Sequence, residues 1–187
     1  MNYPNKIKKE KQTISHSNRG MNLEYDLDLT NNYYKNNNIA LIYKKATPIK
    51  VTKIQNVCDN KAIIKEGFFQ KKSTTDYNGV YKGYYIDFEA KETKNKTFFP
   101  INNIHKHQIE HLQRVIENKG IAFIIIYFVS LNKLFFINGL DIINYIKQNN
   151  YTNIKIDWIY KYGILIEQKY KPRIDYIKVI DKILEAR

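Results

Sequence analysis

The longest apolar run of the chain, IAFIIIYFV at residues 121–129, constrains the fold more than any other feature. It is too short to span a bilayer as a helix, which requires about 20 apolar residues. An unbroken apolar strand is typical of the centre of a sheet that is covered on both faces. The run therefore predicts a central strand in an α/β domain, with helices packed against the sheet.

A second strand is predicted at residues 84–92, YYIDFEAKE, because polar and apolar side chains alternate there. Its polar face would carry Tyr85, Asp87, Glu89 and Lys91, and its core face Ile86, Phe88 and Ala90. Just upstream, Asn78 and Gly79 form a strong two-residue turn signal, since both residue types tolerate positive φ. We therefore expect a β-hairpin that folds Asp76 back toward Glu89.

Two carboxylates and a lysine in one small space are suited to cutting a phosphodiester. Asp76 and Glu89 provide the oxygen ligands that Mg²⁺ prefers, and a bound metal acidifies water and polarises phosphoryl oxygens. Lys91 would add positive charge at the attacking water or the transition state. By itself a Glu-x-Lys triplet in a lysine-rich chain is usually a solvated strand face. Asp87 lies on the same predicted face, so the pattern leaves both Asp76 and Asp87 open as the first metal ligand.

The net charge of +13 is large for 187 residues and favours nucleic acid or anionic lipid as a partner. An AT-rich genome, which inflates lysine content, is the alternative explanation. A basic amphipathic helix typical of membrane-surface proteins is missing, so we expect no membrane partner and a soluble, cytoplasmic protein. Cys58 is the single cysteine, which excludes an internal disulfide. His107 and His111 are spaced i, i+4 but lack the glutamate of a zinc-protease helix.

The polar, lysine-rich residues 1–17 predict a flexible basic tail, followed by one domain at 18–187. Helices are predicted from a cap at Asn18 or Asn22 to about Asn36, over 104–118 with Asn103 as cap, over 140–147, and from Pro172 onward. Glu24 on the first helix lies either within reach of an active site or where it simply complements the helix dipole.

Residues 49–57 and 62–69 predict two strands that form a basic, aromatic-ended hairpin. Such a hairpin either projects from the domain as an arm or belongs to the main sheet with its lysines in water. Both alternatives agree with the sequence.

Several motifs together resemble the RecU family, the Holliday junction resolvases of low-GC Gram-positive bacteria and their wall-less relatives. The resemblance is carried by NYPN near the start, NRGMNLE at 18–24, YYKNNNIALIYKKATPIKV at 33–51, STTDYNGVYKGYYIDFEAKETKNKT at 73–97, HQIEHL at 107–112 and PRIDYI at 172–177. It covers residues 18–120 well, and its most specific part is the block from TTDYNG to EAKETKNK.

The resemblance implies a restriction-endonuclease-like fold, with a mixed sheet between helices, that acts as a homodimer on a four-way DNA junction. It implies Mg²⁺, with Mn²⁺ as a substitute, held by Thr74, Asp76, Glu89 and Gln108, and a transition state stabilised by Lys91. Asp87 is then a supporting acid. By pattern alone, Thr74 is an ordinary strand residue and Gln108 an exposed helix position.

The family also has a stalk that enters the junction centre, which the resemblance places at about 44–69. The candidate DNA-binding residues are Arg19, Lys65, Phe68, Lys71 and Lys72. The implied reaction is paired symmetric nicking, with 5′-phosphate and 3′-hydroxyl ends, during homologous recombination and DNA repair. RecA recombinase is a further implied partner. The alternatives are a sequence-specific restriction-type endonuclease and a non-catalytic junction-binding protein that modulates the recombinase.

Overall fold

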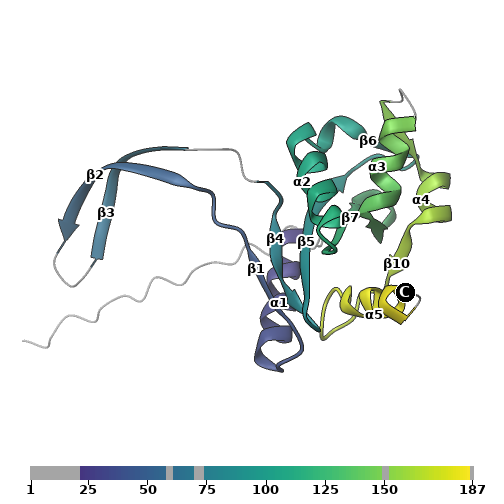
Figure 1. The fold of residues 1–187 in the computed structure, drawn as a ribbon, viewed down its shortest axis with the longest axis horizontal. Coiled ribbons are helices and arrows are strands. Elements are labelled where there is room, and N and C mark those ends of the chain that lie inside the picture. The colour runs from purple at the N-terminus through teal and green to yellow at the C-terminus, as the bar shows by residue number, and fades with distance from the viewer. Residues whose placement is uncertain (1–21, 58–60, 70–73, 149–151, 186–187) are drawn as a thin grey trace, which may run out of the picture.

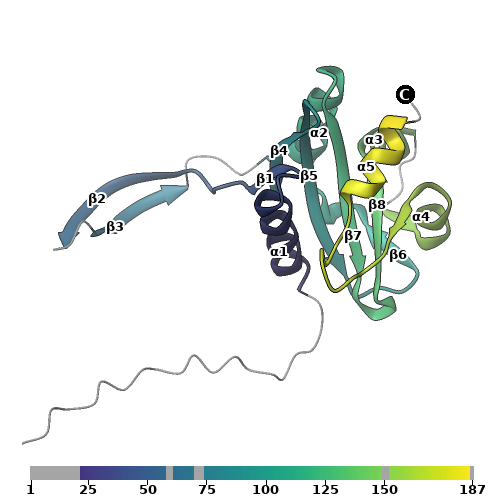
Figure 2. The same cartoon turned by 90° about the horizontal axis from the view of Figure 1, so that it is seen from below.

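The computed structural model describes residues 22–57, 61–69, 74–148 and 152–185. Its centre is a six-stranded mixed sheet (Figures 1 and 2). The strand order is β1 (Leu41–Lys44), β4 (Tyr77–Tyr81), β5 (Tyr84–Thr93), β7 (Ile121–Phe128), β8 (Lys133–Asn138) and β10 (Ile164–Ile166). Neighbouring strands are antiparallel, except for the parallel pair β5 and β7. A parallel pair requires a crossover connection, and this one contains helix α2.

Helices cover both faces of this sheet. One face packs against α1 (Leu23–Asn36) and α5 (Ile177–Glu185), and the other against α2 (Lys106–Glu117), α3 (Gly139–Gln148) and α4 (Ile156–Tyr162). Strand β7 is buried along its whole length between the two apolar clusters. The prediction of a central strand in an α/β domain is therefore confirmed. A small sheet of β6 (Phe98–Pro100) and β9 (Asn153–Lys155), and 3-10 turns at Ile101–Asn103 and Val129–Leu131, complete the body.

The two strands β2 (Ile49–Val57) and β3 (Lys61–Phe69) form an antiparallel ribbon separate from the main sheet, which we call the stalk. Figure 1 shows it projecting away from the body, between β1 and β4 in the chain. The described side chains of β3 are exposed, including Lys65 and Phe68. Of the two arrangements that the sequence allowed, the structure has the projecting arm.

The hairpin of β4 and β5 is present, but the prediction of its turn is wrong. Asn78 and Gly79 lie inside β4, and the turn is formed by Lys82 and Gly83, with φ of 48° and 81°. Positive φ at both central residues suits a two-residue hairpin turn. Gly79 meets a different need, because a Cβ there would lie 1.9 Å from the carbonyl oxygen of Leu41. The close approach of β1 therefore explains the glycine.

The prediction of Asn22 as a cap of the first helix is confirmed: the helix begins at Leu23, and the Asn22 side chain accepts a hydrogen bond from Tyr25 N at 3.1 Å. The starts of two later helices differ from the predictions. Helix α2 begins at Lys106 rather than at residue 104, because residues 101–103 form a 3-10 turn and His105 is the cap. Helix α5 begins at Ile177, five residues after Pro172. Among the described residues, no helix is both long and apolar enough to cross a membrane.

Candidate active site

The hairpin of β4 and β5 brings Asp76 next to Glu89. Tyr77 pairs with Phe88 in the ladder, so the preceding residue, Asp76, lies opposite Glu89. The Oδ2 atom of Asp76 accepts a hydrogen bond from the backbone N of Ala90 at 3.0 Å. Two acids that lie 13 positions apart in the sequence thus share one edge of the hairpin, as the alternation of β5 requires.

Glu89 is fully buried, and its two carboxylate oxygens have different surroundings. Oε1 accepts hydrogen bonds from Lys91 Nζ at 2.5 Å and from Gln108 Nε2 at 2.6 Å. Oε2 is buried and has no hydrogen-bond partner among the described residues. An unpaired buried carboxylate oxygen is costly, because the water that solvated it has been removed without replacement. This oxygen is therefore the first candidate for a cation ligand.

The environment of Glu89 also disfavours its charged form. Burial first, and the nearby Asp76 carboxylate second, raise the pKa of Glu89 from 4.5 to about 7, with Lys91 opposing both effects. Near neutral pH the protonated and the ionised forms of Glu89 are therefore both populated. A divalent cation beside Oε2 would replace that proton and stabilise the ionised carboxylate.

Gln108 lies on the inner side of α2, contrary to the prediction of an exposed position. Its Oε1 accepts a hydrogen bond from the backbone N of His105 at 2.9 Å, while its Nε2 faces Glu89. Oε1 retains a second lone pair for a metal. The spacing i, i+4, i+7 of Gln108, Leu112 and Val115, all buried, is the signal that could have placed Gln108 on this face.

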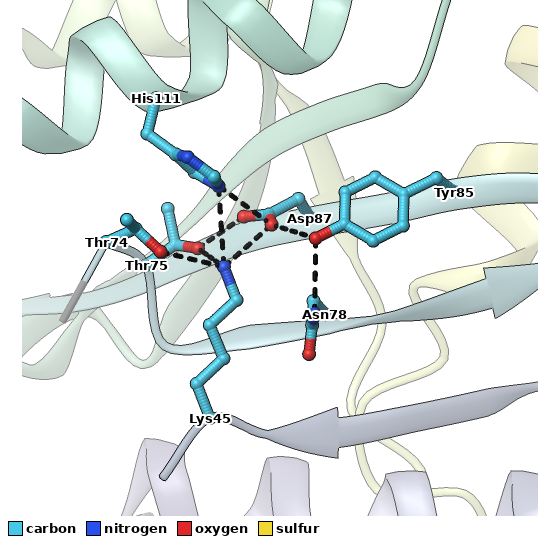
Figure 3. A network of polar contacts seen from close by, with 7 residues as sticks. All are labelled: Lys45, Thr74, Thr75, Asn78, Tyr85, Asp87 and His111. Carbon is cyan, nitrogen blue, oxygen red and sulfur yellow. Dashed lines mark hydrogen bonds and ion pairs between the residues drawn. The ribbon is translucent and has the colours of Figure 1, made fainter. Parts of the chain in front are cut away.

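Asp87 is also fully buried, but hydrogen-bond donors surround it (Figure 3). Oδ2 accepts from Lys45 Nζ at 2.7 Å, Tyr85 OH at 2.8 Å and His111 Nε2 at 3.0 Å. Oδ1 accepts from the hydroxyl of Thr75. Asp87 is therefore engaged with protein donors, whereas Oε2 of Glu89 has no partner in the part of the chain that the structure describes. Sequence reasoning missed Lys45 and Thr75 because nothing in the pattern links them to β5.

The other candidate residues are distributed as follows. Thr74 Oγ1 accepts a hydrogen bond from Lys45 Nζ at 3.0 Å, at the edge of this cluster. Glu24 forms an exposed ion pair with Lys44 at 2.6 Å. Lys65 and Phe68 lie on the stalk, where Lys50 Nζ is 5.8 Å from the ring centroid of Phe68. Arg19, Lys71 and Lys72 lie outside the described residues.

The described residues contain no group of three or more His, Cys, Asp or Glu side chains arranged to hold a metal. An ion at Glu89 would draw on two carboxylates together with hydroxyl, amide and water oxygens. This donor set fits Mg²⁺, which usually keeps several waters and binds one or two carboxylates.

Known proteins with similar sequences support one family. A family model described as Recombination protein U (RecU) matches residues 18–182. Similar relatives from Bacillus cereus (strain AH820) and Bacillus anthracis (strain CDC 684 / NRRL 3495) are both named Holliday junction resolvase RecU. Each is 48% identical over 183 residues, which covers 96% of this chain and 90% of the relative.

A solved structure of Archaeoglobus fulgidus Hjc, described as a Holliday junction resolvase from an archaeal hyperthermophile, also matches. The match has a TM-score of 0.43 and 13% identity, and covers 76% of this chain and 93% of that chain. The family match and the identity to the Bacillus proteins show that this chain belongs to the RecU family.

Proposed function

We propose that this protein is a Mg²⁺-dependent endonuclease that resolves four-way DNA junctions by paired symmetric nicks during homologous recombination and DNA repair. The names of its relatives support the substrate. The buried Oε2 of Glu89, unpaired among the described residues and beside Asp76, is the observation that carries the metal-dependent chemistry. Residues 18–187 would act as one nuclease domain, in the cytoplasm where such DNA is found.

The proposed ligands are Thr74, Asp76, Glu89 and Gln108, with Mn²⁺ able to replace Mg²⁺. When bound, the ion would acidify a water molecule and polarise the phosphoryl oxygens. Glu89 fits this role because Oε1 is hydrogen-bonded, whereas Oε2 has no partner among residues 22–57, 61–69, 74–148 and 152–185. Asp76 fits because the Ala90 amide fixes its carboxylate opposite Glu89.

Lys91 would stabilise the transition state of phosphodiester cleavage. Its ammonium is held by Glu89 Oε1 at 2.5 Å, and its side chain retains 22% exposure, so the positive charge lies at the boundary between the buried acids and solvent. A phosphate that reached this boundary would place its developing negative charge beside the ammonium. Attack on the phosphorus with departure of the 3′ oxygen leaves the 5′-phosphate and 3′-hydroxyl ends that a ligase can seal.

Substrate recognition would depend on shape and backbone charge. The stalk projects from the body (Figure 1) and would enter the open centre of a junction, and the chain has a net charge of +13. Phosphate contacts of this kind position a protein without reading sequence. The resemblance to the family alone supports two further partners, a second copy of the chain that would place two sites on two strands, and RecA recombinase.

A comparison of two DNA substrates tests this function. A synthetic immobile four-way junction and a linear duplex of the same sequence are offered to the protein with Mg²⁺, with Mn²⁺ or with EDTA. We expect paired nicks in the junction with either metal, none with EDTA, and little cutting of the duplex. Equal cutting of linear DNA would instead indicate a restriction-type endonuclease. Junction binding without any metal-dependent cutting would indicate a non-catalytic binding protein.

A further inference from the structure

Lys45 joins the two ends of the stalk where they meet the body. It directly follows β1, and its backbone N donates to the carbonyl oxygen of Asp76 at 2.8 Å. Its Nζ donates to Thr74 Oγ1 at 3.0 Å and to Thr75 Oγ1 at 2.5 Å. Main chain and side chain of one lysine therefore hold the segment that returns from the stalk, Thr74 to Asp76.

The ammonium of Lys45 is itself anchored on the carboxylate of Asp87 (Figure 3). The exposed fractions of the two side chains are 14% and 0%, so the pair is largely desolvated. Since a carboxylate only accepts, the Nε2 of His111 donates to the same Oδ2 atom, and α2 thereby joins the cluster. The Lys45 cluster, consisting of Lys45, Thr74, Thr75, Asp87 and His111, thus connects β1, the return segment, β5 and α2.

Neither member of the Lys45–Asp87 pair is placed to act on DNA or metal directly. Asp87 is fully buried and already accepts from four donors. The Lys45 ammonium points toward its acceptors on Thr74, Thr75 and Asp87. With a side chain that is 14% exposed, it is largely shielded from a phosphate. In contrast, the residues that the cluster holds are proposed metal ligands or neighbours of them.

We propose that Lys45 is a positioning residue, whose ammonium, anchored on Asp87, fixes the Thr74–Asp76 segment so that its oxygens face Glu89. The inference rests on the proposed metal site. It gives Asp87 a definite role, since the acid acts through Lys45 and Thr75. It also links the base of the stalk to the metal site, because one residue contacts the chain on both sides of the stalk.

The double variant Lys45→Met/Asp87→Asn tests the inference. It removes one positive and one negative charge, so the net charge around the metal site is unchanged while the Lys45–Asp87 ion pair is lost. The Mn²⁺ affinity of the protein without DNA is measured from the electron paramagnetic resonance signal of free Mn²⁺. We expect affinity about tenfold weaker than in the wild type, since loss of residues that orient metal ligands costs about 10–100-fold.

Two further readouts separate positioning from other roles. Junction affinity in EDTA should change less than about twofold, because neither residue is placed to contact DNA. The single-turnover cleavage rate of the double variant should fall at limiting Mn²⁺ and recover largely at saturating Mn²⁺. Excess Mn²⁺ occupies the metal site by mass action even when its affinity is weakened. Lys82→Met/Asp181→Asn is the matched control, as it removes another 2.7 Å lysine–aspartate pair, at the far end of the same hairpin, without a change of net charge.

If the double variant does not fold, Thr75→Val and Thr75→Ser replace it. Valine removes the hydroxyl through which Thr75 bonds to both Lys45 and Asp87, whereas serine keeps it. Only the valine variant should lose Mn²⁺ affinity. The inference would be overturned if the double variant, or Thr75→Val in its place, bound Mn²⁺ as tightly as the wild type. The proposed function would then remain intact. A wild-type protein that neither binds Mn²⁺ nor cuts junctions would overturn both.

Discussion

At the scale of single residues, Glu89 shows a conflict between stability and function. Its buried carboxylate has one oxygen that no described residue satisfies, and burial raises the pKa of the group to about 7. Such a group destabilises the metal-free protein whenever it is ionised. Residues of this kind are expected at sites where a ligand later supplies the missing interaction.

Replacing Glu89 by Gln should therefore stabilise the metal-free protein while abolishing cleavage. The folded pKa lies above the unfolded value, so the fold is destabilised as pH rises from about 4.5 to 7 and remains so above it. At pH 8 we expect Glu89→Gln to add about 1–2 kcal/mol, or roughly 2–6 °C in Tm. Calorimetry in EDTA measures this, with the exposed Glu167→Gln as control. A lower Tm for Glu89→Gln would contradict the assignment.

Metal affinity should depend on pH for the same reason. Below pH 7 the ion must displace a proton from Glu89, whereas above pH 7 it need not. The Kd for Mn²⁺ should therefore fall by up to about tenfold per pH unit between pH 5 and 7 and then level off. Titrations at fixed ionic strength measure it. A Kd that stayed constant across this range would exclude Glu89 as a protonated ligand site.

At the scale of elements, the sequence predicts strands and helices better than the contacts between them. Alternation over residues 84–92 predicts strand β5, because its apolar side chains pack in one core cluster while its polar side chains face the candidate site. The apolar run at 121–129 predicts β7, because both faces of that strand are buried. The turn predicted at Asn78-Gly79 is wrong because a glycine is needed there for another reason. Strand β1, whose Ile42 lies 37 positions upstream, approaches Gly79 too closely for a Cβ atom. Local turn preference cannot reveal such a non-local contact.

The candidate site shows the same division. Asp76, Glu89 and Lys91 could be predicted, because strand periodicity and a hairpin place them together. Gln108 was implied only by the family resemblance, and Lys45 by nothing in the sequence, since their roles depend on how α2 and β1 pack against β5. The Lys45 contact to Asp87 spans 42 positions, and no short-range pattern encodes it.

Removing the stalk tests its role as an element. Residues 47–72 would be replaced by about four Gly and Ser residues, because Lys45 and Thr74 already lie in hydrogen-bond contact. A two-stranded ribbon adds little stability by itself, so we expect Tm to change by less than about 3 °C. Junction affinity should fall by about tenfold or more, measured by fluorescence anisotropy, while affinity for linear duplex changes less. Unchanged preference for junctions would contradict a recognition role.

At the scale of the whole molecule, charge should dominate DNA binding. The chain has a net charge of +13, and both the body and the stalk contain exposed lysines, for example Lys106 and Lys65. Binding that releases counterions from phosphates weakens steeply with salt. With about six phosphate contacts, junction affinity should fall about 10³-fold between 50 and 200 mM KCl. Equilibrium binding in EDTA measures this slope, and a flat salt dependence would contradict recognition through the backbone.

A metal ion between Asp76 and Glu89 is the central claim, and anomalous diffraction from crystals soaked in Mn²⁺ tests it most directly. We expect an anomalous peak at each site, about 2.0–2.3 Å from oxygens of both carboxylates, with Glu89 Oε2 among the ligands. Asp87 should stay bonded to Lys45. A peak coordinated by Asp87, or no peak near Glu89 in crystals of protein that binds Mn²⁺ in solution, would contradict it.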